Sequence, residues 1–166
     1  MSKLKSISKD AVPRALELAE RYRLMKEPSV SESICIDILE VDPDNQEALV
    51  TLLLAISEQF KEQLMPGYKK TREILDRITN EYQRAFYEGI INERRALAHF
   101  QKESYGSGWQ AHAWFEKAIN AYEKAIALHP AGNNDAILRW NNCYRTMARY
   151  PEIVSPPQDD DEQMLE

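Results

Sequence analysis

The sequence predicts an all-α protein, and three observations support this prediction. Only 5 of the 166 residues are glycine, and the composition is dominated by Leu, Ala, Glu, Lys and Arg, which favour helices. Apolar residues recur at the spacing of an amphipathic helix, whereas the alternation typical of strands is almost absent. Prolines and small clusters of Asn, Asp and Gly separate these apolar runs. A chain of this length fits one domain.

Seven helical segments are expected between these breaks. The first follows Asp10, which can cap a helix, and carries Pro13 in its first turn, where a missing N–H costs nothing. Pro28 ends it, and Pro43 ends the second. The expected helices span residues 11–25, 29–40, 45–60, 69–79, 80–103, 109–128 and 134–149. The stretches QLMPGY and SYGSG are expected to be loops because of their glycines and proline.

The net charge of −6 is concentrated in one segment. The residues after Tyr150 include six acidic and no basic residues, so the rest of the chain is close to neutral. A neutral body gives no reason to expect nucleic acid as a ligand. The stretch MSKLKSISKD has no apolar core typical of a secretory signal, and no window approaches the ~18 apolar residues of a membrane span. We therefore expect no membrane insertion and a cytoplasmic location.

These observations predict three regions. Residues 1–10 are expected to be a flexible N-terminus, and residues 11–150 a helical domain. Residues 151–166, with adjacent prolines and the run DDDE, are expected to be a disordered acidic tail.

The stretch AWFEKAINAYEKAIALHPAGN indicates that the helices form repeats. Ala118, Tyr122, Ala125 and Pro130 follow one another as small, aromatic, small and proline residues. This pattern resembles the second half of a tetratricopeptide repeat (TPR), and the segment up to Pro43 resembles a degenerate copy of about 34 residues. The resemblance implies antiparallel helical hairpins stacked as a right-handed superhelix, with about three pairs and a C-terminal capping helix. It also implies a concave face formed by the first helix of each pair.

Gly89 lies in the middle of the fifth expected helix, where glycine costs about 1 kcal/mol relative to alanine. We therefore expect a close helix crossing at this position, where a side chain would clash.

Motifs of catalysis and cofactor binding are missing from the sequence, so we expect a non-enzymatic protein without cofactor or metal. The three histidines, His99, His112 and His129, lack the i+3 or i+4 partner of a helical metal site. Cys35 and Cys143 are expected to be buried thiols. Carboxylates that could form a catalytic pair are better explained as solvated surface charges; these are Asp76, Glu88 and Glu93.

Aromatic residues gather in the C-terminal half. Core packing between helix pairs explains them best, although an exposed aromatic residue could also anchor a partner. The residues concerned are Trp109, Trp114, Phe115, Tyr122 and Trp140.

The TPR resemblance implies a partner-binding groove on the concave face. The predicted partner-binding residues are Arg23, Phe86, Arg94, Asn141, Tyr144 and Arg145, with Glu20 and Glu93 on the same face. Arginine and asparagine donors there suit a protein or peptide segment that carries acidic groups. Leu16 and Glu20 stand where carboxylate-gripping TPR domains have their ligands, so an Hsp70/Hsp90 tail-binding role is not expected.

The function expected from these features is that of an adaptor. Two alternatives stay open, a structural subunit of a larger assembly and a helical enzyme with its site in the groove.

Overall fold

The computed structural model describes residues 3–158, and within them every regular element is a helix. A short 3-10 turn at Lys9–Ala11 precedes seven α-helices. These are α1 (Val12–Leu24), α2 (Pro28–Val41), α3 (Gln46–Ser57), α4 (Phe60–Leu75), α5 (Glu81–Phe100), α6 (Ser107–Leu128) and α7 (Asp135–Arg149). The predicted all-α class is therefore confirmed.

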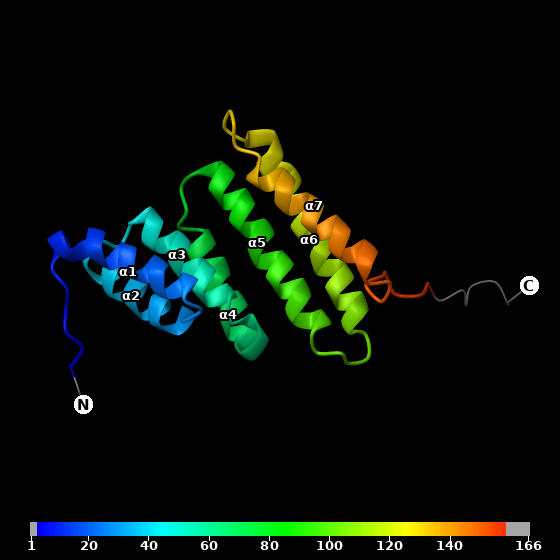
Figure 1. Cartoon of the computed structure of the whole chain (residues 1–166), viewed down its shortest axis with the longest axis horizontal. Coiled ribbons are helices and arrows are strands. Elements are labelled where there is room, and N and C mark those ends of the chain that lie inside the picture. The colour runs from blue at the N-terminus through cyan, green and yellow to red at the C-terminus, as the bar shows by residue number, and fades with distance from the viewer. Residues whose placement is uncertain (1–2, 159–166) are drawn as a thin grey trace, which may run out of the picture.

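The helices follow one another in chain order along the long axis of the molecule (Figure 1). Each packs against the next, as expected for an array of antiparallel helices joined by short connections. The right-handed superhelix stays a prediction. Among the described residues, none of the helices has the length and apolar content needed to cross a membrane.

Short polar residues fix where several helices begin. The side chains of Asn45 and Asn80 accept hydrogen bonds from the backbone N–H groups of Ala48 and Gln83, both at 2.9 Å, and so cap α3 and α5. Prolines occupy the first turns of α1 and α2.

The stretch QLMPGY belongs to α4, so the prediction of a loop was wrong. Gln63 has non-helical angles (φ −137°, ψ 55°) and divides α4 into two parts. Pro66 thus stands in the first turn after a break, where its missing N–H costs nothing. Gly67 is buried, and a Cβ there would lie 3.1 Å from the Phe60 ring. A close contact with Phe60, rather than a turn, is what favours glycine at this position.

The loop predicted at SYGSG is confirmed for residues 104–106 between α5 and α6, whereas Ser107 and Gly108 already belong to α6. Gly106 has a φ of 79°, a conformation that suits glycine, and α6 begins one residue later at Ser107. The backbone N–H of Ser104 donates to the hydroxyl of Ser107 at 3.0 Å.

Two large apolar clusters fill the molecule. The N-terminal cluster joins α1 to α5 and contains Ala19, Cys35, Leu49, Leu52, Leu53, Ile56, Phe60, Leu64, Ile74, Leu75, Ile78, Ile91 and Ala98. The C-terminal cluster joins α5 to α7 and contains Ile90, Ala96, Ala111, Phe115, Ala118, Ile119, Tyr122, Cys143 and Ile153, with Trp114 and Trp140 packed against it. Leu54 and Tyr87 pack against both clusters. The helix α5 therefore belongs to both halves of the array.

The predicted close crossing at Gly89 is confirmed. A Cβ at Gly89 would lie 2.3 Å from Cε1 of Tyr122, whose side chain is fully buried. The absence of a side chain at Gly89 lets α5 approach α6, and the Tyr122 ring occupies the space.

Packing extends past both predicted domain boundaries. Ile7 packs against a small cluster formed by Val12, Ile38 and Ala48. At the other end Ile153 is buried in the C-terminal cluster, and the carbonyl oxygen of Glu152 lies where a Cβ of Gly108 would be. The packed part of the chain thus reaches Ile153, whereas the run DDDE of the predicted tail lies outside the described residues.

We expect Ile153→Asp to lower the free energy of unfolding by about 2 kcal/mol or more, because it replaces a buried apolar contact with a charge. A chain ending after Val154 should melt at the same temperature as the full chain, as measured by circular dichroism. A lower melting temperature for that truncation would show that residues beyond Val154 stabilise the fold.

Both cysteines are buried free thiols, as predicted. Burial raises the pKa of Cys35 to about 12, and burial raises the pKa of Cys143 as well. The reactive thiolate is therefore strongly disfavoured at both positions.

Candidate functional site

The first helices of three successive hairpins line an open hollow of about 430 Å³. The lining residues are Glu20 and Arg23 of α1, Gln46, Glu47, Val50, Thr51 and Leu54 of α3, and Gln83 and Tyr87 of α5. A second hollow of about 410 Å³ shares Gln83 and Tyr87 and continues to the α6–α7 connection. It is lined by Asn80, Tyr82, Gln83, Phe86, Tyr87, Leu128, Pro130, Asn133 and Asp135. We call the two together the inner hollow.

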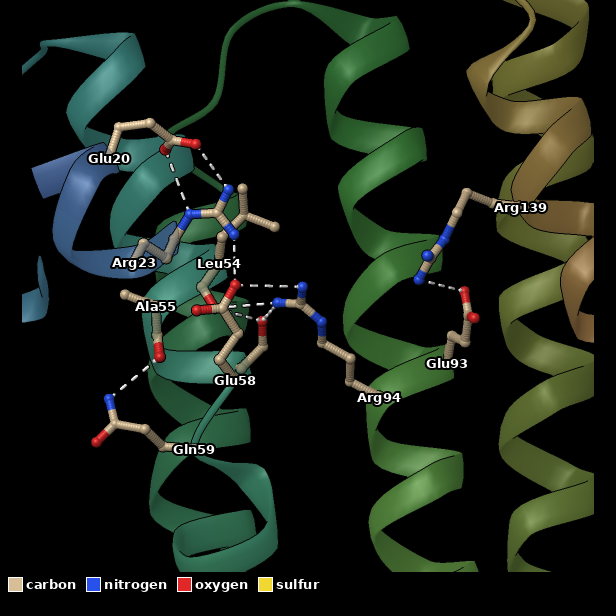
Figure 2. A network of polar contacts seen from close by, with 10 residues as sticks. Glu20, Arg23, Leu54, Ala55, Glu58, Gln59, Glu93, Arg94 and Arg139 are labelled. Carbon is tan, nitrogen blue, oxygen red and sulfur yellow. Dashed lines mark hydrogen bonds and ion pairs between the residues drawn. The ribbon is translucent and has the colours of Figure 1, made fainter. Parts of the chain in front are cut away.

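A chain of ion pairs crosses α1, α3 and α5 beside the inner hollow (Figure 2). Arg23 pairs with Glu20 at 2.9 Å and also with Glu58, which follows α3. Arg94 of α5 lies 3.5 Å from the same carboxylate. Burial alone would lower the pKa of Arg23. The hydrogen bonds and charges of Glu20 and Glu58 outweigh the effect of burial, so the pKa of Arg23 is raised. The four charges of Glu20, Arg23, Glu58 and Arg94 therefore neutralise one another.

Arg94 connects two helices. Its Nη1 donates to the carbonyl oxygen of Leu54 at 3.0 Å and to the hydroxyl of Ser57 at 2.5 Å. Burial lowers its pKa, and the charge of Glu58 only partly counters this effect. Arg94, predicted to bind a partner, is thus largely enclosed, because its donors satisfy the C-terminal groups of α3.

Glu93 lies beside Arg94 in sequence and is 1 % exposed, so its interpretation as a solvated surface charge was wrong. Its carboxylate accepts from the hydroxyl of Tyr122 at 2.6 Å and from Nδ2 of Asn142 at 3.0 Å. It also pairs with Nη2 of Arg139 at 3.0 Å (Figure 2). The pKa of Arg139 is lowered by burial but raised more by the charge of Glu93 and by Tyr122. Three helices thus meet at one buried carboxylate.

Phe86 is half-buried among aromatic rings. Its ring lies 5.9 Å from those of Tyr82 and Tyr122 and 5.2 Å from that of Tyr87. It lines the second part of the inner hollow but also packs against the C-terminal cluster. Phe86 therefore contributes to the packing of the core as well as to the surface of the inner hollow.

The predicted residues of α7 do not converge with those of α1 and α5. Tyr144 is 60 % exposed and stacks on Trp140 with the two rings 5.6 Å apart. Arg145 is exposed and Asn141 is half-buried. The side chains of α7 that reach α5 are Arg139 and Asn142 instead. Asn141, Tyr144 and Arg145 thus lie outside the polar contact between α7 and α5, and their role in partner binding stays a prediction.

Residues that sequence reasoning missed contribute much of the inner hollow. Tyr87 and Gln83 line both of its parts, and Glu47 lines the first. The hydroxyl of Tyr87 forms no hydrogen bond within residues 3–158, and burial raises its pKa. Tyr87 precedes the crossing glycine by two residues, so its place on the α5 face could have been found by extending the repeat pattern.

The carboxylates considered as a catalytic pair have three different environments in the part of the chain that the structure describes. Residues 3–158 contain no group of three or more His, Cys, Asp or Glu side chains placed to hold a metal ion. The buried carboxylate of Glu93 is enclosed by its donors rather than directed into a hollow. Asp76 is exposed at the end of α4, and Glu88 pairs with Arg72 at 2.9 Å.

His99 provides a test of stability against pH. Burial lowers the pKa of His99, and the nearby charges of Arg95 and Lys102 lower it further. The unfolded chain therefore binds the proton more readily than the folded chain does. The free energy of unfolding is accordingly highest above the ordinary pKa of about 6.5, and it decreases as the pH falls below that value. Urea unfolding between about pH 7 and 5 should show this loss, and His99→Gln should reduce it. An equal slope in both proteins would contradict the prediction.

Comparison with known proteins gives one weak relative. The chain is 26% identical over 139 residues to DnaJ homolog subfamily C member 3 of the mouse (Mus musculus), a protein that contains TPR repeats. The match covers 80% of this chain but only 27% of that protein. No family model and no solved structure matches the chain. The all-helical array and this relative are consistent with a TPR-like repeat and favour a role in protein interaction.

Proposed function

We propose that this protein is a non-enzymatic adaptor that binds a segment of another protein along the inner hollow. The observation that carries the proposal is that α1, α3 and α5 together line one open surface. Such a surface suits an extended segment that crosses several helices, as helical repeat arrays use their inner faces. The cytoplasmic location inferred from the sequence belongs to the same proposal.

The chemistry of the inner hollow favours a segment with a basic side chain. Glu47 and Asp135 are exposed on it, and neither carboxylate has a cation within 4 Å among the described residues. Arg23 is already held by Glu20 and Glu58. The acidic segment expected from the sequence thus finds few free donors here, whereas a Lys or Arg side chain can pair with Glu47 in the first part of the hollow or with Asp135 in the second, and the Tyr87 ring lines both parts.

A displayed library of random peptides tests this function. We expect selection on the intact protein to enrich peptides with Lys or Arg beside an apolar residue. Binding of the enriched peptides should fall at least tenfold in the variant Glu47→Lys, because an attractive charge becomes a repulsive one at an exposed position. A matched control is Glu62→Lys, which makes the same charge change on the exposed start of α4.

Enriched peptides that bind both variants equally well would show that the inner hollow is not the binding surface. A photoreactive side chain at position 83 gives independent evidence, since it should cross-link to the selected peptide. The same group at position 105, which is 94% exposed in the α5–α6 loop, should not.

The structural-subunit alternative is favoured by the apolar surface at the two ends of the array. Leu24 and Met25 are 71% and 58% exposed at the end of α1, and Leu138 is 64% exposed on α7. If these ends hold neighbouring subunits, Leu138→Lys should change the molar mass measured by light scattering. An equal molar mass for the original protein and the Leu138→Lys variant would favour the adaptor.

A further inference from the structure

A hollow of about 400 Å³, separate from the inner hollow, lies between α4, α5 and α6, and we call it the outer groove. It is lined by Tyr68 and Arg72 of α4, Glu88 and Asn92 of α5, and Trp114, Lys117, Asn120, Ala121 and Lys124 of α6. The inner hollow, in contrast, uses Gln83 and Tyr87 of α5. Gln83 and Asn92 are two and a half helical turns apart and therefore project from opposite sides of α5. The two surfaces can be occupied separately.

Cations surround the outer groove. Arg95 stacks on two aromatic rings, with its guanidinium carbon 4.2 Å from the centre of Tyr68 and 3.8 Å from that of Trp114. The ammonium group of Lys117 lies 4.1 Å from the same Trp114 ring. Lys124 is exposed on the groove about two turns further along α6.

These cations lack acidic partners in the described residues. No carboxylate there lies within 4 Å of Arg95, Lys117 or Lys124, whereas Arg72 is paired with Glu88 at 2.9 Å. Aromatic rings stabilise the positions of two of the free cations without neutralising them. Two lysines without an acidic partner therefore line the groove, and Arg95 adds a third such charge on the Tyr68 and Trp114 rings that form part of its wall.

Asn92 adds a directed donor at the base of the groove. Asn92 is only 4 % exposed, and its Oδ1 accepts a hydrogen bond from the hydroxyl of Tyr68 at 3.2 Å. That bond orients the amide and leaves Nδ2, which donates no hydrogen bond to any described residue, available to a ligand. A buried amide that lines a hollow with an unused donor favours an acceptor group as its partner.

We propose that the outer groove binds an acidic peptide segment of a partner protein. Carboxylates of the segment would pair with Lys117 and Lys124, and one of them would accept from Nδ2 of Asn92, while an apolar side chain of the segment would pack on Trp114 and Tyr68. Nucleic acid fits less well, because residues 1–150, the groove included, carry equal numbers of acidic and basic residues and so have no net positive charge to attract a phosphate backbone.

Fluorescence anisotropy of the labelled synthetic peptide Asp-Leu-Asp-Asp-Leu-Glu-Asp with the full chain tests this proposal. We expect binding that weakens with added salt and that falls at least tenfold in the double variant Lys117→Glu, Lys124→Glu. Both lysines are exposed, so the fold should persist. The matched control Lys5→Glu, Lys61→Glu makes the same charge change at exposed sites away from the groove and should bind within about twofold of the original protein.

Two further probes separate the possible ligands. The peptide in which every Asp and Glu is replaced by Asn and Gln should bind at least tenfold more weakly, and so should a short oligothymidine. In NMR spectra, the indole N–H signal of Trp114, assigned with Trp114→Phe, should shift most as the acidic peptide is added. The proposal is overturned by no binding of the acidic peptide, by equal binding of the amide peptide, by tighter binding of the oligonucleotide, or by insensitivity to the Lys117 and Lys124 changes.

Discussion

Gly89→Val should lower the free energy of unfolding by about 3 kcal/mol or more, because it forces a branched side chain into a closed helix crossing. Even the first atom of that side chain would lie 2.3 Å from Cε1 of Tyr122. The Tyr122 ring cannot move easily, since it is fully buried and its hydroxyl is bonded to Glu93 at 2.6 Å. Urea unfolding followed by circular dichroism measures the loss.

Gly89→Ala makes the test sharper because two physical effects predict opposite changes in the free energy of unfolding. Helix propensity alone predicts a gain of about 1 kcal/mol, whereas the contact with Tyr122 predicts a loss. The control Ala113→Gly, on the exposed face of α6, measures the propensity difference in this chain without a packing contribution. If Gly89→Ala raised the stability by the amount that Ala113→Gly removes, the crossing would not be as close as described.

Glu93→Ala should cost about 3 kcal/mol, because it removes the acceptor shared by three donors. Tyr122 and Asn142 would lose their partner, and the guanidinium of Arg139 would stay partly buried without a counter-charge. Since Arg139 and Asn142 belong to α7, we also expect the amides of α7 to lose protection in hydrogen exchange more than those of α1.

Glu88→Ala is the matched control for this substitution. Glu88 lies on the same helix and also pairs with an arginine, but its side chain is 31% exposed and Arg72 is 41% exposed. A surface pair of this kind contributes less than about 1 kcal/mol. Equal losses in the two variants would mean that the burial of Glu93 has no energetic consequence.

The sequence predicted those features that depend on local patterns. The helices end near the prolines and Asn/Asp clusters because these residues restrict the backbone wherever they occur. The crossing at Gly89 could also be predicted, since a glycine in the middle of an amphipathic helix needs a packing reason.

The errors concern features that depend on distant residues. Pro66 and Gly67 indicate a loop by composition, but a break at Gln63 and the Phe60 ring allow a helix there. Glu93 and Arg94 are neighbours with similar polarity, yet one is buried by groups from α6 and α7 and the other bonds to α3. Nothing local separates their environments, because the decisive partners lie about 30 to 50 residues away.

The face of α7 was the least predictable part of the candidate site. A terminal helix has no following hairpin to restrict its outer side, so its apolar positions alone do not decide which of the flanking polar side chains contact α5. Arg139 and Asn142, rather than Asn141 and Arg145, reach α5 because Glu93 lies opposite them.

The position of Leu54 and Tyr87 between the two apolar clusters has a consequence for folding cooperativity. These two side chains pack against both clusters, so the stability of the α1–α4 end of the array is coupled to that of the α6–α7 end. In a linear array the coupling between neighbours decides whether the chain unfolds in one transition or end by end. Leu54 and Tyr87 also line the inner hollow. A ligand bound there would strengthen that coupling, and unfolding would become more nearly a single transition.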